Sequence, residues 1–209
     1  MKSTSDPTAT TPRYAPVMFL PSVMLPHVLM PLFIFEPRYR AMLTHCLEKN
    51  RMFCVALLRP GVTEASGPAD YFPVAGLGLV RACVRHDDGT SHLILQGVSR
   101  VELGKYIQEQ PFRIAELREL PTTNASGTEI DGLVEKVREK CSEMLPSDGA
   151  DREKLKEQIA QLTDPGAFAD VVAHTLLRNP YRQQEVLEQL FVPERLSSLL
   201  RHLRAEMAE

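Results

Sequence analysis

The 209-residue sequence lacks the features that mark several common classes of protein. A membrane-spanning helix needs about 20 consecutive apolar residues, and no apolar run in the sequence is close to that length. Residues 1–16 are polar, with no apolar core of the kind that a secretory signal carries. The net charge is only −3, so bulk electrostatics imply neither a nucleic-acid partner nor a membrane surface. These absences predict a cytoplasmic protein.

Motifs for nucleotide, nucleophile and metal chemistry are missing as well. The sequence contains no G-x-x-x-x-G-K-[ST] phosphate loop and no G-x-S-x-G nucleophile elbow. Its six histidines are not spaced as convergent metal ligands, and His86 and His92 are expected on opposite faces of a hairpin. We therefore predict a non-catalytic protein with no cofactor and no metal site.

The four cysteines also argue against a metal or disulfide framework. Cys46, Cys54, Cys83 and Cys141 are scattered, and no C-x-x-C pair occurs. The sequence therefore predicts buried, reduced thiols and a reducing compartment.

The first part of the chain has the pattern of a small β-barrel. Short apolar or alternating segments recur at regular spacing and are separated by turn residues, which is typical of barrel strands. The predicted strands cover residues 17–20, 29–35, 51–58, a hairpin within 74–92, 96–103 and 112–120. Asp88-Gly89 predicts a two-residue type I′ turn in the hairpin, which would pair Val84 with Leu93.

After residue 120 the apolar period changes from two to about 3.6, which predicts helices. Apolar stripes run through residues 130–145 and 155–162, and Asp164-Pro165 and Asn179-Pro180 are typical helix starts. Strands followed by helices indicate an α+β fold. The expected division is a disordered tail at 1–16, a barrel at 17–120, a linker at 121–127 and a helical bundle at 128–209.

Residues 29–40 join a strand directly to a helix. The strand has bulky apolar side chains on both parities, which predicts burial on both of its faces. Pro37 suits the first turn of a helix, and Glu36 places negative charge at the positive end of that helix. Glu36 and Arg40 have the spacing of an i,i+4 ion pair.

Residues 31–40, PLFIFEPRYR, resemble the P-L-x-I-F-E-x-R-Y signature of the N-terminal, substrate-binding domain of Lon proteases. Residues 162–173 are similar to the D-P-x-x-L-A-D-x-V-A segment of that family, and residues 184–196 to its Q-x-L-L-E and V-x-x-R-L elements. The resemblance covers about residues 17–207. It implies a PUA-like β-pseudobarrel followed by an α-helical bundle. Because the phosphate loop of the Lon ATPase is absent, we expect a stand-alone Lon-like domain without the ATPase and peptidase domains.

The resemblance also implies a function, because in Lon proteases this domain helps to select and hold protein substrates. We expect a non-catalytic module that binds unfolded or specific proteins, in trans with a Lon-type protease or by itself, and that can self-associate. Pro31, Phe33 and Tyr39 are the candidate peptide-binding residues, since they lie on the signature and could face a groove. The signature residues expected to be structural are Leu32, Ile34, Phe35, Glu36, Arg38 and Arg40, the first three as core and Glu36 as cap and arginine partner.

Two other functions stay open at this point. PUA-like barrels in other proteins bind RNA, and Arg81, Arg85 and His92 are expected on one outer face of the hairpin. The near-neutral barrel and the lack of aromatics among its basic residues make nucleic acid a less favoured partner. The third alternative is ligand binding or hydrolysis in a cleft between barrel and helices.

Overall fold

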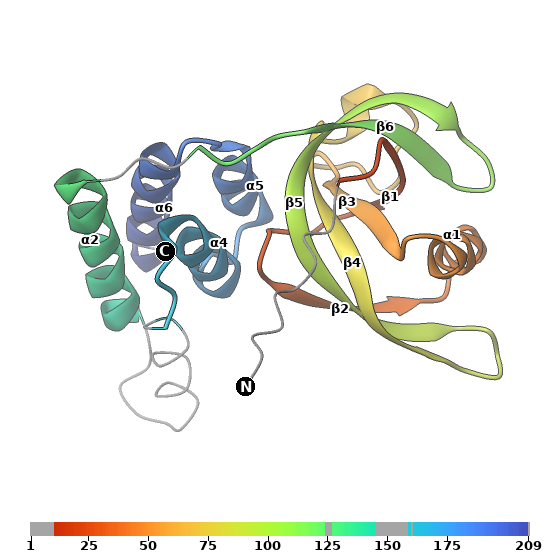
Figure 1. Ribbon diagram of the computed structural model, residues 1–209, viewed down its shortest axis with the longest axis horizontal. Helices are drawn as coiled ribbons and strands as arrows, with labels where there is room; N and C mark the ends of the chain where they lie inside the picture. The colour runs from red at the N-terminus through yellow and green to blue at the C-terminus, as the bar shows by residue number, and fades with distance from the viewer. Residues whose placement is uncertain (1–10, 124–126, 145–158, 160, 209) are drawn as a thin grey trace, which may run out of the picture.

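The computed structural model describes residues 11–123, 127–144, 159 and 161–208. Figure 1 shows two parts side by side, a barrel of strands and a group of helices, which confirms the predicted α+β fold. The strands are β1 (Tyr14–Leu20), β2 (Leu29–Ile34), β3 (Met52–Leu57), β4 (Val74–Arg85), β5 (Ser91–Gln108) and β6 (Arg113–Glu119). The helices are α1 (Pro37–Glu48), the short 3₁₀ helix η1 (Pro68–Asp70), α2 (Thr128–Met144), α4 (Pro165–Leu176), α5 (Pro180–Glu188) and α6 (Val192–Met207).

Two of the predicted segments lie partly outside the described residues. The tail expected at 1–16 lies outside them up to residue 10, and its residues 14–16 belong to β1. The apolar stripe expected at 155–162 also falls largely outside them. No helix of the described residues is long and apolar enough to cross a membrane.

The six strands form one sheet in the order β2-β5-β4-β3-β1-β6. β6 also pairs with β5, so five of the strands close into a barrel, and β2 is left beside β5 as an edge strand. β5 can take part at both ends because it has 18 residues and changes register between Leu103 and Gln108. Such irregularities bend a strand and increase its twist. The predicted barrel is therefore confirmed, with an open edge at β2.

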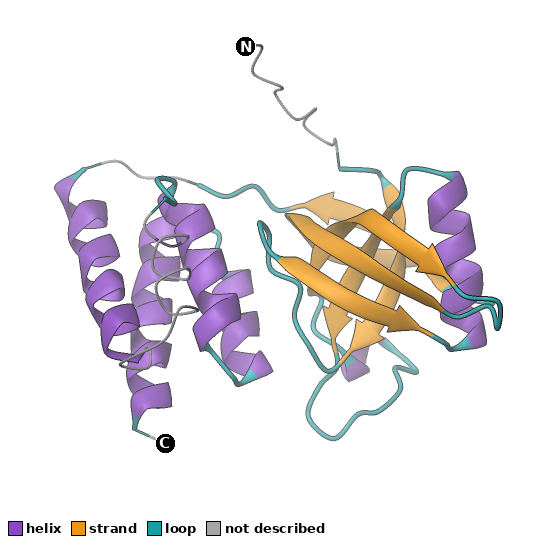
Figure 2. Ribbon diagram, turned by 90° about the horizontal axis from the view of Figure 1, so that it is seen from below, coloured by secondary structure: helices purple, strands orange, loops and turns teal. Residues whose placement is uncertain are grey.

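Helix α1 covers the side of the barrel that faces away from the C-terminal helices, as Figures 1 and 2 show. Its buried side chains, Tyr39, Met42, Leu43 and Cys46, recur at helical spacing and join the main apolar core. Pro37 occupies the first turn, as predicted. The strand and helix of the signature are thus fixed to each other through one buried face.

The C-terminal helices begin where the sequence predicts. Asp164 caps α4 by accepting a hydrogen bond from the Ala167 N–H at 2.8 Å, and Asn179 caps α5 by accepting one from the Tyr181 N–H at 2.9 Å. A proline follows each cap at the first helical position. Both arrangements satisfy backbone donors that a helix leaves free at its start.

A buried polar network joins the barrel to the helices. Arg100 of β5, only 3% exposed, forms a bidentate ion pair with Asp170 of α4, and its Nε donates to the Leu187 carbonyl of α5 at 2.9 Å. Arg195 of α6 lies 3.5 Å from the same carboxylate. Its Nε donates to the Gln189 carbonyl at 2.9 Å. Burial lowers the pKa of Arg195 to about 10, an effect that Asp170 partly opposes.

The hairpin between β4 and β5 differs from its prediction. Gly89 has φ of +80°, but Asp88 has no positive φ, so the turn is not type I′. The His86 N–H donates to the Thr90 carbonyl at 2.9 Å, which leaves a three-residue loop. The Asp88 carboxylate stabilises that loop by accepting from the Thr90 N–H at 2.9 Å. The longer loop changes the strand register.

In the observed register Val84 lies opposite His92, and the predicted pairing with Leu93 is wrong. A register shift between Val80 and Ala82 adds to the difference. The expectation for the two histidines is wrong as well. His86 Nε2 lies 2.8 Å from His92 Nδ1, so both rings share one side of the hairpin.

Candidate functional site

Strand β2 is buried on one face only. Met30 and Ile34 are buried, whereas Leu29 and Phe33 are 57% and 49% exposed. Phe35, directly after the strand, is 58% exposed, so its expected place in the core is wrong. The reason is the position of β2 at the sheet edge, where α1 and the core cover one face and no described element covers the other. Side chains on both parities are apolar, but only the even-numbered ones find partners within the chain.

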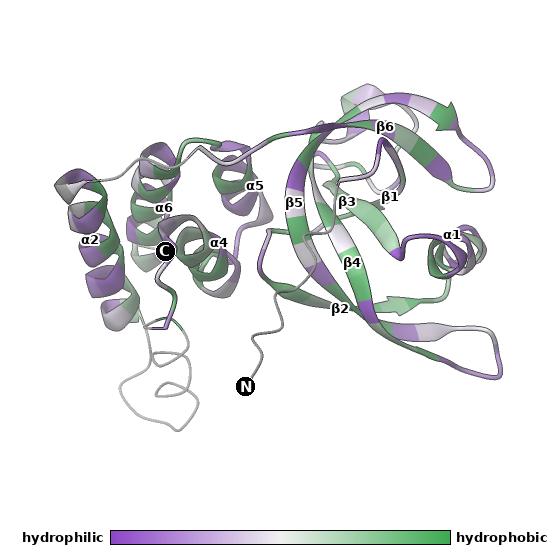
Figure 3. Cartoon of the chain, in the orientation of Figure 1, coloured by the Kyte–Doolittle hydropathy of each residue, from purple (hydrophilic) through white to green (hydrophobic). Residues whose placement is uncertain are grey.

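The outward face of β2 continues over β5 and β4 as one apolar surface. Register places Pro31 opposite Ile94 and Phe33 opposite His92, and the β4–β5 pairing adds two further side chains to the same face. The β2 surface, as we define it, consists of Leu29, Pro31, Phe33, Phe35, Ala82, Val84, His92 and Ile94. A groove of about 360 Å³ is hollowed in it, with the half-buried Cys83 also in its wall. Figure 3 shows the hydrophobic character of β2 along its length.

The β2 surface holds a large share of the exposed apolar side chains of the described residues. It holds Leu29, Phe33, Phe35 and Val84, four of the eight large hydrophobic side chains that are exposed among the described residues. The Phe33 ring lies 5.9 Å from that of Phe35 and 4.6 Å from that of His92, between ring centroids. Contiguous exposed apolar surface of this kind marks an interaction site more often than scattered single residues do.

The free edge of β2 is a poor template for an added strand. The Gly97 N–H of β5 donates to the Val28 carbonyl at 2.9 Å, so even-numbered residues of β2 exchange hydrogen bonds with β5. The backbone groups of Leu29, Pro31 and Phe33 then point to the free edge, where Pro31 offers no N–H. Edge prolines oppose strand pairing. Contacts at the β2 surface therefore depend on side chains more than on main-chain pairing.

The basic residues of the hairpin do not form one patch with His92. Arg81 donates to Gln96 on the outward face. Arg85 lies opposite Ser91, one residue from His92, and its Nη2 donates to Thr44 Oγ1 of α1 at 3.1 Å. Because alternate residues of a strand face opposite sides, the expected common face for Arg81, Arg85 and His92 is wrong.

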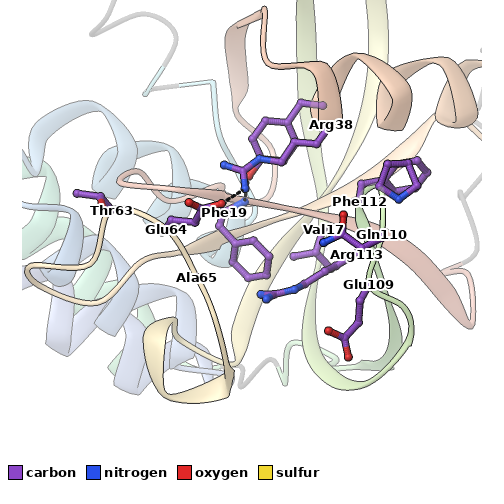
Figure 4. Close-up of a pocket in the computed structure, with 12 residues that line it drawn as sticks. Val17, Phe19, Arg38, Thr63, Glu64, Ala65, Glu109, Gln110, Phe112 and Arg113 are labelled. Atoms are coloured by element: carbon purple, nitrogen blue, oxygen red, sulfur yellow. Dashed lines mark hydrogen bonds and ion pairs between the residues drawn. The ribbon is translucent and has the colours of Figure 1, made fainter.

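The charged residues of the signature lie on two sides of α1. Glu36 forms an ion pair of 2.8 Å with Arg38, not with Arg40, and makes no side-chain capping bond. Arg38 also pairs with Glu64, as the dashed line in Figure 4 shows. The Arg40 guanidinium instead packs against Gly89 of the hairpin. Arg38 and Arg40 thus stabilise two different contacts of α1 with the barrel.

Tyr39 lies apart from Pro31 and Phe33. Its ring is buried, its hydroxyl accepts a hydrogen bond from the Phe19 N–H at 3.3 Å, and burial raises the pKa of that hydroxyl. It lines a separate cavity of about 260 Å³ at the start of α1, together with Arg38 and Arg113 (Figure 4). The structure therefore brings Pro31 and Phe33 together on the β2 surface and places Tyr39 elsewhere.

Sequence reasoning missed the other members of both sites. Ala82 and Val84 lie in a predicted hairpin whose register is wrong, and Ile94 lies beyond the range predicted for that hairpin, so the alignment of these residues with Phe33 is not visible from the sequence. Arg113 carried no motif at all. Among the described residues, no group of three or more His, Cys, Asp or Glu side chains could hold a metal ion.

The sequence has many relatives among Lon proteases. It is 28% identical over 200 residues to the Lon protease of Desulfosudis oleivorans, which covers 94% of this chain and 24% of that protein. The Lon protease of Paraburkholderia phytofirmans is 35% identical over 125 residues, 58% of this chain and 15% of that protein. The chain thus spans about a quarter or less of the length of these relatives.

Solved structures show the same fold. The N-terminal domain of a Mycobacterium avium complex Lon protease superposes with a TM-score of 0.72 at 20% identity, covering 91% of this chain and 98% of that one. A Lon N-terminal domain protein from Xanthomonas campestris gives a TM-score of 0.66 at 19% identity, covering 90% and 97%. The family described as the ATP-dependent protease La (LON) substrate-binding domain matches residues 14–205. The chain therefore belongs to the LON substrate-binding domain family.

Proposed function

We propose that this protein is a non-catalytic module that binds segments of other proteins through the β2 surface. The observation that carries the proposal is the continuous apolar face of β2, β5 and β4, whose side chains are exposed although their neighbours on the opposite face are buried. Burying Leu29, Phe33, Phe35 and Val84 against a partner would remove from water apolar area that the chain itself leaves uncovered.

The favoured partner is an extended, apolar segment of an unfolded or partly unfolded protein. The groove has room for about one large side chain at a time, and Phe33, Val84 and His92 provide its walls. Pro31 weakens strand addition at the free edge, so recognition would rest on side-chain burial, which tolerates many sequences. A specific folded partner with an apolar protrusion fits the same surface.

The relatives of this chain are proteases, and the part of them that it matches is a substrate-binding domain. We extend the proposal to a role in protein selection, in trans with a Lon-type protease or independently of one, in the cytoplasm. The alternative partner at the β2 surface is a second copy of the protein, which would give self-association.

The test is fluorescence anisotropy of a labelled, permanently unfolded polypeptide titrated with the protein at two salt concentrations, with an RNA oligonucleotide measured beside it. Apolar recognition predicts binding of the polypeptide that barely changes with salt. Binding of RNA alone, with an affinity that collapses as salt rises, would replace this proposal by a nucleic-acid function. Sedimentation of the protein alone over the same concentrations reports self-association.

A further inference from the structure

The cavity at the start of α1 is built from four segments that are distant in sequence. Val17 and Phe19 of β1, the first turn of α1, residues 63–65 after β3, and the β5–β6 turn at residues 109–113 provide its walls (Figure 4). Its volume of about 260 Å³ is slightly below the usual range of small-molecule pockets, which is about 300–1,000 Å³. It therefore has room for a single side chain or chain end, but not for a long segment.

Arg113 is the polar wall residue whose bonding is incomplete. Its Nη2 donates to the Ser66 carbonyl at 3.0 Å, and its guanidinium carbon lies 5.3 Å from the Phe19 ring centroid and 5.1 Å from that of Tyr106. Nη1 is buried and has no hydrogen-bond partner among the described residues. The Tyr106 hydroxyl and the Asp70 carboxylate also interact favourably with the guanidinium. An unsatisfied buried donor is nevertheless costly, and a guanidinium has a strong preference for carboxylate.

The other charged groups of the cavity restrict what can approach Arg113. Arg38 is already paired with Glu36 and Glu64, so its charge is neutralised within the chain. Arg38 and its two carboxylate partners together keep one net negative charge, and Glu109 adds another, so the wall would repel a ligand that carries several negative charges. Phe19, Tyr39 and Phe112 supply apolar surface next to these groups.

We propose that this cavity binds an apolar group that ends in a single carboxylate. The carboxylate pairs with the Arg113 guanidinium, and the apolar group packs against Phe19, Tyr39 and Phe112. Two sources have this chemistry: the C-terminal residue of a protein and a free carboxylic acid. The site is separate from the β2 surface, because Pro31 and Phe33 lie on the outward face of the sheet and line none of this cavity.

The decisive comparison uses the unaltered protein. A labelled peptide that ends in leucine is titrated as the free acid and as the C-terminal amide, and N-acetyl-leucine is used as the competitor. We expect the acid to bind at least about tenfold more tightly than the amide, the ratio that loss of a charged hydrogen bond produces. Competition by N-acetyl-leucine at the peptide's own concentration range identifies a free acid as the source, and competition only at far higher concentration identifies a protein C-terminus. Equal binding of acid and amide would overturn the proposal.

Variants then locate the contact. Arg113→Gln should abolish the preference for the free acid, and Arg113→Lys should retain part of it. Arg59 provides the matched control, because its guanidinium also lies over a ring, that of Phe72 at 4.5 Å, but outside the cavity. Arg59→Gln should leave the preference unchanged. Phe33→Ser should leave it unchanged too, so failure of the β2-surface proposal and failure of this one give different results. A preference that survives Arg113→Gln would contradict the assignment.

Discussion

Two regions of this molecule depart from the rule that apolar groups are inside and charges outside. Between the barrel and the helices, Arg100, Asp170 and Arg195 are charged and almost fully buried. On the β2 surface, Phe33 and Phe35 are apolar and about half exposed or more. The two departures differ in how they are compensated.

The buried charges have their partners within the chain. Arg100 and Arg195 bind the same carboxylate and donate to backbone carbonyls, so the cost of removing the charges from water is offset by ion pairs and hydrogen bonds. The exposed apolar residues have no such compensation among the described elements. The buried network holds the two parts of the chain together, whereas the β2 surface is the face that we propose for a partner outside the chain.

Removing the carboxylate shared by Arg100 and Arg195 should cause the largest loss of stability. Asp170→Ala leaves Arg100 and Arg195 buried without a counter-charge, so we expect a loss of about 3–5 kcal/mol in the free energy of unfolding. Urea unfolding measures it. The matched control is Glu116→Ala, whose ion pair with Arg13 is solvent-exposed and should be worth below about 1 kcal/mol. Similar losses in both variants would contradict a structural role for the buried network.

Polar substitutions on the β2 surface should leave stability nearly intact and reduce binding. For Phe33→Ser combined with Phe35→Ser we expect a change within about 1 kcal/mol in unfolding free energy, because both rings are already exposed. The affinity for an unfolded polypeptide should fall about tenfold, because the burial of two rings is lost. Anisotropy gives the affinity. Ile107→Ser, which alters an equally exposed residue elsewhere, serves as the control. If the double variant and the unaltered protein bind the polypeptide with equal affinity, the β2 surface is excluded as the binding site.

Acidification should destabilise the protein through two histidines of its helical part. Burial lowers the pKa of His174 in α4 and of His202 in α6, so folding favours the neutral form of both rings. The stability that this gives is complete above the unfolded-state pKa of about 6.5, and it is lost as pH falls from there through the lower folded-state values. We expect the urea midpoint to drop between pH 7.5 and 5.5, and His174→Gln to reduce that drop. An identical pH dependence in the variant would contradict the assignment.

The smallest expected effect is a difference in reactivity among the four cysteine thiols. Burial raises the pKa of Cys46 and Cys141 to about 12, and it raises that of Cys54 further. These three should resist a thiol reagent at pH 8 until the protein unfolds, whereas the half-buried Cys83 should react first. A reagent titration with mass spectrometry counts the modified sites. Because Cys83 lines the groove of the β2 surface, its modification should also weaken polypeptide binding.

Sequence alone predicted those features that depend on local signals. Asp164-Pro165 and Asn179-Pro180 start α4 and α5 as predicted, because a cap and a proline act within one turn. The period change after residue 120 likewise separates strands from helices. The α+β fold and the helix starts were accessible for this reason.

The candidate sites depend on positions that local signals do not determine. Phe35 was expected in the core because it is apolar, but its exposure follows from the edge position of β2, which only the assembled sheet defines. The pairing of Arg100 with Asp170 joins residues 70 positions apart, and only Asp170 belongs to a segment that the sequence motifs single out. Asp170, a carboxylate within the apolar stripe of α4, and Arg195, in the V-x-x-R-L element, give no indication from sequence that they share one network with Arg100. Whether Pro31, Phe33 and Tyr39 bind peptide stays a prediction.

Binding at the β2 surface is tested most directly by amide hydrogen exchange of the protein with and without a bound unfolded polypeptide. The Leu29 and Phe33 amides point to the free edge of β2 and should exchange rapidly in the free protein. Binding at the β2 surface predicts slower exchange there and in the hairpin strands around Val84 and His92, with α2 and α6 unchanged. Slower exchange confined to the helices, with β2 unaffected, would contradict binding at the β2 surface.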